Sequence, residues 1–206
     1  MALRGWGLIL VAASVLSLVA LASNATTMSQ IEAQANTLLA VRRTISQLLS
    51  TGTVWAGLAV LSGWLVRRPG QAFAAGIVAL LIALVVHYGV GLIFGIFDPD
   101  VWTENSYWFQ VAVVVGGPLG LVGAIARRPD LWGVVARLVV PVGALLEPFV
   151  IGLFTSSAII PWPTRVALVI SGVVLLAAGT AGCIQVLVAA RKQRSSTRER
   201  RAIADT

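Results

Sequence analysis

The chain has few charged residues and almost none of the residues that carry acid–base or redox chemistry. Only 11% of its 206 residues are Asp, Glu, Lys or Arg, whereas soluble domains carry about 25%. One cysteine and one histidine are present, so neither an intrachain disulfide nor a cysteine-based metal site can form. The composition excludes a water-soluble globular domain.

Motifs for nucleotides, zinc or a hydrolase nucleophile are missing as well. The chain has no Walker-type loop, no zinc-spaced cluster of His, Cys, Asp and Glu, and no Gly-x-Ser-x-Gly segment. The net charge of +7 lies mainly in short turns and near the C-terminus, so we do not expect nucleic acid as a partner. We expect a non-enzymatic protein with no cofactor and no metal.

Long apolar runs dominate, and 58% of the residues are hydrophobic. A helix needs about 20 apolar residues to cross the roughly 30 Å hydrocarbon core of a bilayer. The runs predict an all-α fold, a polytopic membrane helical bundle with six transmembrane helices in a single domain over residues 1–190. The expected spans are residues 6–22, 48–66, 72–97, 107–126, 131–154 and 166–190.

The first two segments allow other interpretations. Ala20-Leu21-Ala22 resembles a signal-peptidase site, so a cleaved signal peptide is the alternative to the first span. An even number of spans favours a retained signal-anchor helix, which we expect. Residues 28–47 carry apolar side chains near helical spacing. They predict an amphipathic connector that lies on the membrane surface or extends the second span.

The charges around the runs predict an orientation. Arg-Arg-Pro turns occur at 67–69 and 127–129, and six of the 15 basic residues lie in the last sixteen positions. Because basic loops face the cytoplasm, we expect both termini on the cytoplasmic side of the bacterial inner (plasma) membrane. The polybasic tail 191–206 is then cytoplasmic and is expected to rest on anionic lipid. Arg42 and Arg43 fall on the opposite side and are the main objection.

The pattern of turn and apolar run recurs sixty residues later. Arg67-Arg68-Pro69 aligns with Arg127-Arg128-Pro129, which makes 48–97 and 107–154 a possible internal hairpin repeat. Chance similarity between apolar segments is the alternative.

This alignment pairs His87 with Glu147, two ionisable groups inside apolar runs. At 1.5 Å per residue, each lies about 24 Å from its basic turn. Ionisable groups inside a membrane usually turn inward and find partners. We therefore predict a solute or ion site at His87 and Glu147, with Tyr88 nearby. The alternative is structural, with a neutral His87 donating to a backbone carbonyl and a protonated Glu147.

Gly117 and Pro118 lie near the middle of the fourth expected span. A proline inside a helix removes a hydrogen bond and kinks or interrupts the helix. Interrupted helices near the midplane often border binding sites, so Gly117 and Pro118 join the site candidates. A simple packing kink is the alternative. The small-residue series Ala112/Gly116/Gly120/Ala124 predicts a close helix contact.

Residues 55–90 and 116–123 carry a resemblance to a known family. In the first, a tryptophan-bearing span leads to Arg-Arg-Pro and then to an alanine-rich span that ends at His87-Tyr88. The second reads Gly-Gly-Pro-Leu-Gly-Leu-Val-Gly. Both resemble an uncharacterised family of small, mostly actinobacterial, six-span membrane proteins, a domain of unknown function. The resemblance covers about residues 48–190 and implies a fold but no activity.

These observations favour a membrane subunit that binds or passes a small solute or ion through an intramembrane polar site. The alternative is a structural or regulatory subunit of a larger membrane complex, which would contact other membrane subunits or a second copy of itself. In both cases the lipid bilayer is a partner. The two hypotheses differ in whether His87, Glu147 and Pro118 line a common polar cavity.

Overall fold

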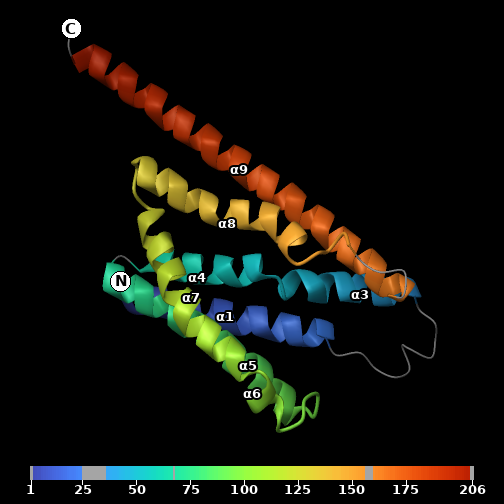
Figure 1. Ribbon diagram of the computed structural model, residues 1–206. Coiled ribbons are helices and arrows are strands. Elements are labelled where there is room, and N and C mark those ends of the chain that lie inside the picture. The colour runs from blue at the N-terminus through green and yellow to red at the C-terminus, as the bar shows by residue number, and fades with distance from the viewer. Residues whose placement is uncertain (1, 25–35, 67, 156–159, 205–206) are drawn as a thin grey trace.

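The protein is a bundle of long apolar helices (Figure 1). A computed structural model describes residues 2–24, 36–66, 68–155 and 160–204, and every regular element within these ranges is a helix. The helices are α1 (Ala2–Asn24), α3 (Asn36–Leu49), α4 (Gly52–Leu65), α5 (Pro69–Ile93), α6 (Val101–Glu104), α7 (Ser106–Ile125), α8 (Leu131–Val150) and α9 (Trp162–Ala204).

Five of the described helices are long and apolar enough to cross a membrane, and six spans result if α3 and α4 together form one. The chain is therefore a multi-pass membrane protein. The amphipathic connector predicted at 28–47 is helical as α3 from Asn36 onward, while residues 25–35 lie outside the described part. Helix α9 spans 43 residues and continues through the basic tail to Ala204.

The predicted second span, 48–66, is wrong at its start. Instead of one helix, α3 ends at Leu49 and α4 begins at Gly52, with a bend of 44° between them. We call residues 50–51 the break. Helix α4 has 14 residues and is about 21 Å long at 1.5 Å per residue, too short to cross the bilayer alone. Helices α3 and α4 pass the length and hydropathy requirement of a span only together, as a bent pair.

Two spans end earlier than the hydrophobic runs suggested. Helix α5 stops at Ile93 and is followed by Gly95 with φ +64°, and α8 stops at Val150 before Gly152 with φ +68°. A left-handed residue just past a helix is a common C-terminal stop, and glycine adopts it without steric cost. Hydrophobicity continues past both stops, so run length alone overestimated these helices.

Helix α7 packs closely against both α4 and α5 through glycines. A Cβ atom added at Gly63 would stand 1.8 Å from the carbonyl oxygen of Gly120, and one added at Gly76 would stand 2.0 Å from that of Gly116. Only residues without a side chain allow backbones to approach so closely. The helix contact predicted from Gly116 and Gly120 is therefore confirmed.

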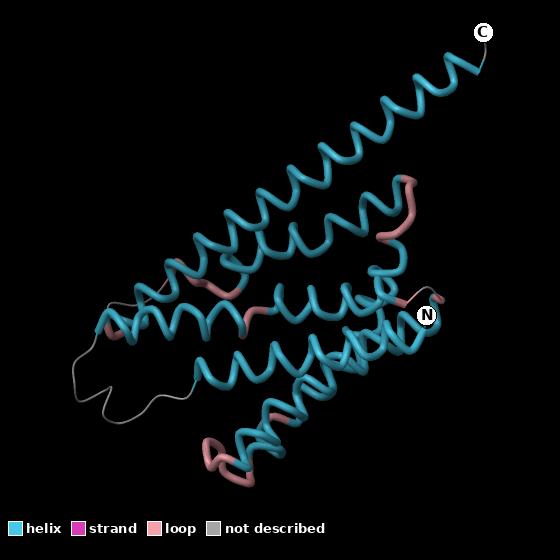
Figure 2. The backbone as a smooth tube through the Cα atoms, turned by 180° about the vertical axis from the view of Figure 1, so that it is seen from behind, coloured by secondary structure: helices cyan, strands magenta, loops and turns pink. Residues whose placement is uncertain are grey.

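The helices form two groups (Figures 1 and 2). Helices α1, α4, α5 and α7 share one apolar core, while α8 lies along α9 in a second group that α3 also joins. In the possible repeat, α4 and α5 contact each other extensively, whereas α8 leaves α7 and packs on α9. The two hairpins are packed differently, so the structure does not reproduce the repeat as two equivalent units.

The connections between the helices lie at two ends of the bundle. The amino terminus and the α4–α5 and α7–α8 turns lie at one end of the bundle, and the α5–α7 and α8–α9 connections lie at the other (Figures 1 and 2). Arg42 and Arg43 are at this second end, where Arg42 donates to the carbonyl oxygen of Ala22 at 3.2 Å and Arg43 donates to the hydroxyl of Thr164. These two arginines thus bind helix termini and do not lie in the middle of a span.

Candidate functional site

The break leaves two helix ends inside the bundle, and side chains satisfy their backbone groups. At the end of α3, Thr51 Oγ1 donates to the carbonyl oxygen of Leu48 at 2.7 Å, and Trp55 Nε1 donates to that of Leu49 at 3.1 Å. At the start of α4, Thr51 Oγ1 accepts from the N–H of Val54 at 3.4 Å. Unpaired backbone groups would be costly here, because apolar surroundings offer no replacement partners.

Glu147 of α8 completes the start of α4. Its carboxyl oxygens accept from the N–H of Gly52 at 2.6 Å, from the N–H of Thr53 at 2.8 Å, and from the hydroxyl of Thr53. Accepting in all three hydrogen bonds is the arrangement that a carboxylate makes. The positive end of the α4 dipole favours an anion at this place. Glu147 therefore caps a helix that lies 94 residues earlier in the chain than its own position.

His87 has a different partner. Its Nδ1 lies 3.4 Å from the carbonyl oxygen of Ser17 in α1, and the buried hydroxyl of Ser17 donates back to Ala83 of α5 at 2.7 Å. A carbonyl oxygen only accepts, so Nδ1 donates in this contact, and in a neutral imidazole Nε2 is then an acceptor. The rings of Tyr88 and Phe97 pack on the imidazole with centroids 5.3 and 5.5 Å away.

The structure does not bring His87 and Glu147 together by a hydrogen bond, although both are described. The contact of His87 with a backbone carbonyl follows the structural alternative for that residue. Glu147 instead accepts hydrogen bonds from the backbone N–H groups at the start of α4, a contact that neither interpretation of this residue predicted. His87 and Glu147 lie at equal depth along their helices but are not hydrogen-bonded to each other, because depth does not determine the direction in which each side chain points.

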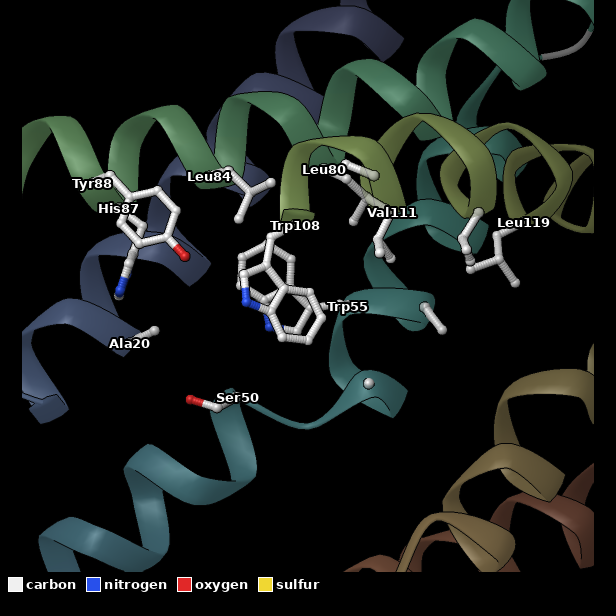
Figure 3. A pocket seen from close by; sticks show the side chains of 14 residues that line it. Ala20, Ser50, Trp55, Leu80, Leu84, His87, Tyr88, Trp108, Val111 and Leu119 are labelled. Carbon is white, nitrogen blue, oxygen red and sulfur yellow. The ribbon is translucent and has the colours of Figure 1, made fainter. Parts of the chain in front are cut away.

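A pocket of about 370 Å³ lies between α1, α4, α5 and α7 beside the break (Figure 3). Its polar or aromatic lining residues are Ser50, Trp55, His87, Tyr88 and Trp108. The rest of the wall is apolar except for the backbone of Gly52, which donates to Glu147. The predicted residues His87 and Tyr88 thus lie on the wall, and the carboxylate lies directly behind it.

Gly117 and Pro118 are in α7 but do not line this pocket. The Pro118 ring is exposed, and a Cβ added at Gly117 would stand 2.4 Å from the ring of Phe73. The predicted interruption is wrong: α7 continues past Pro118, and α8 continues past Pro141 and Pro148. Neighbouring helices can compensate for a carbonyl that a proline frees, and the helix then continues.

Sequence reasoning missed Ser50, Trp55 and Trp108. A local signal for the break was present in Ser50-Thr51-Gly52-Thr53, because serine and threonine are favoured helix N-caps. It was overlooked because apolar residues continue on both sides and suggested one uninterrupted helix.

Comparisons with models of protein families, with curated proteins and with solved structures found no match for this chain.

Proposed function

We propose that the protein is a non-enzymatic membrane subunit that binds a small solute in the pocket between α1, α4, α5 and α7. The observation that carries this proposal is a pocket of about 370 Å³ located at a break in a membrane helix. Ligand pockets are commonly 300–1,000 Å³ in volume and are mostly apolar with a few placed polar groups. The wall beside the break has this composition.

The break supports binding more than a structural role. Irregular backbone at membrane depth is tolerated where protein or a cavity covers it, and discontinuous helices border the substrate sites of many transporters. Here Thr51, Trp55 and Glu147 together satisfy the backbone groups that the break frees. One side chain from the break and two from helices α4 and α8 thus maintain a feature that a continuous helix would not need.

The wall fits a solute better than a metal cation. Hard cations take six or more oxygen ligands, mostly carboxylates and carbonyls. The wall offers the hydroxyls of Ser50 and Tyr88 and one nitrogen of His87, while the Glu147 carboxylate is already bonded to Gly52 and Thr53. These groups suit a ligand that is positioned by a few hydrogen bonds.

The alternative role as a structural or regulatory subunit has less support. The closely packed glycines of α4, α5 and α7 contact one another within the chain, so they are not available to a partner. For orientation, we propose that the end with both Arg-Arg-Pro turns faces the cytoplasm, together with both termini. We propose that the tail 191–206 contacts anionic lipid: Arg191 and Lys192 are exposed, while the side chains beyond residue 193 lie outside the described part.

Native mass spectrometry of the protein purified from its own membrane tests the proposal. The wild type should carry a small-molecule adduct that Ala56→Phe loses, because Ala56 lines the pocket and a phenyl ring there would fill it. Leu61→Phe is the matched control, since Leu61 is on the same helix with 45% of its surface exposed, and it should keep the adduct. An adduct of equal occupancy in all three proteins would contradict the proposal, as would its absence from the wild type.

A further inference from the structure

The pocket has a polar end and an apolar end that are stacked along the bundle axis. Trp108 is near the start of α7 and Leu119 lies eleven positions deeper, about 16 Å along the helix. On the antiparallel helix α5, His87 and Tyr88 are near the end of the helix at Ile93, and Leu80 lies deeper. Polarity therefore decreases from the end of the spans towards the middle of the membrane.

The side of the pocket opens between helices. Helices α4 and α7 touch where Gly63 meets Gly120, near the basic turns, and separate towards the opposite end (Figures 1 and 2). The lining residues Trp108 and Val115 of α7 are 52% and 41% exposed. Exposed side chains on the spans of a membrane bundle face hydrocarbon, so this opening gives access from the lipid phase.

The wall disfavours an anionic head group. It contains no lysine or arginine, and Glu147 is bonded to Gly52 directly behind it, so an anion would find repulsion and no counter-charge. The hydroxyls of Ser50 and Tyr88 and the Nε2 atom of His87 offer hydrogen bonds to a neutral group. Figure 3 shows the indoles of Trp55 and Trp108 between these polar groups and the apolar end. The aromatic side chains of the wall favour contact with a planar ring.

We propose that the pocket binds a single-chain amphiphile from the bilayer whose head group is an uncharged ring with hydroxyl or carbonyl oxygens, the chemistry of a quinone, a quinol or an alkylphenol. The ring lies at His87 and Tyr88, and the chain runs along Leu80, Val115 and Leu119 towards the midplane. This inference rests on the proposed function and names the ligand class of the same pocket.

Photoaffinity labelling in lipid nanodiscs tests it. The probe is an alkylphenol with a diazirine in its chain, and labelled peptides are mapped by mass spectrometry. Labels should concentrate on residues 111–119 and 80–84. An excess of decylubiquinone should reduce them about tenfold, whereas the same excess of oleate, which has a single chain and an anionic head, should leave them unchanged.

Head-group variants separate specific binding from general lipid contact. The double substitution His87→Phe with Tyr88→Phe removes two hydrogen-bonding groups and should lower labelling about three- to tenfold. Tyr107→Phe is the matched control, because Tyr107 is 64% exposed and does not line the pocket, and it should have no effect.

Three results would overturn the inference. The first is labelling of the exposed residues Val139 and Val142 of α8 that equals the labelling of the pocket residues. The second is competition by oleate as strong as that by decylubiquinone. The third is full labelling of the Ala56→Phe variant. If the labelling fails while the wild type still carries an adduct that Ala56→Phe loses, the lipid class is wrong and the solute site stands. Failure of both experiments rejects both proposals.

Discussion

Glu147→Ala should lower the free energy of unfolding by about 2–4 kcal/mol. The substitution removes the acceptor for the N–H groups of Gly52 and Thr53 and for the Thr53 hydroxyl. A hydrogen bond to a charged group contributes about 1.5–3 kcal/mol, and the bonds here are exposed at Gly52 and partly buried at Thr53. The lost interaction with the α4 dipole adds about 0.3–1 kcal/mol. The sum is reduced because Gly52 lines the pocket and water there can replace part of the loss.

Two further substitutions separate the contributions of individual hydrogen bonds to this loss of unfolding free energy. Glu147→Gln keeps one acceptor oxygen but turns an NH2 group towards a backbone N–H, so it should lose about 1–2 kcal/mol. Thr53→Val removes only the hydroxyl hydrogen bond and should lose about 0.5–1.5 kcal/mol. The expected order of stability is therefore wild type, then Thr53→Val and Glu147→Gln, then Glu147→Ala.

The assay is denaturant unfolding at fixed lipid content, together with hydrogen–deuterium exchange of the peptide that covers residues 50–56. Exchange at Gly52 and Thr53 should accelerate in Glu147→Ala while exchange in the middle of α5 stays constant. His87→Ala combined with Glu147→Ala should be additive within about 0.5 kcal/mol, since the two side chains share no partner. Unchanged exchange at the break, or a loss below about 0.5 kcal/mol, would refute the capping role.

Two more predictions concern packing and orientation. In α5, Gly76→Ala should destabilise the protein by about 1–3 kcal/mol, because its Cβ would stand 2.0 Å from the Gly116 carbonyl oxygen. The control Gly89→Ala in the same helix has nothing within 4 Å of its Cβ and should be neutral or stabilising. A loss of stability at both positions would contradict the close packing of α5 on α7. In a Cys183→Ala background, cysteines at Gly70 and Pro129 should react only from the cytoplasm and one at Asp100 only from outside; the reverse pattern would invert the orientation.

The sequence was sufficient to locate the helices whose length is determined by the thickness of the bilayer. Long apolar runs located α1, α5, α7 and α8 to within a few positions, because a bilayer requires nearly the same length of every span. The ends at Gly95 and Gly152 were missed, since a left-handed glycine stops a helix without changing its hydrophobicity. The glycine contacts of α7 were predictable because small residues at a spacing of four positions lie on one helix face.

The candidate site was only partly predictable because helical depth is readable from sequence and side-chain direction is not. His87 and Tyr88 were identified, yet the pocket also takes Ser50, Trp55 and Trp108 from other elements. Proline was the expected sign of a broken helix, but α7 and α8 continue past their prolines. A proline removes a single donor, which neighbouring packing tolerates.

The break forms where the chain can satisfy a whole set of backbone groups. Thr51 and Trp55 donate hydrogen bonds to carbonyl groups at the end of α3, and Glu147 accepts hydrogen bonds from N–H groups at the start of α4. Glu147 comes from α8, so the second helix group stabilises the start of α4 in the first. Any ligand that displaces Glu147 from Gly52 would weaken the contact between the two groups. The carboxylate that sequence analysis placed in a solute site therefore acts through α4, by holding in position the helix end that borders the pocket.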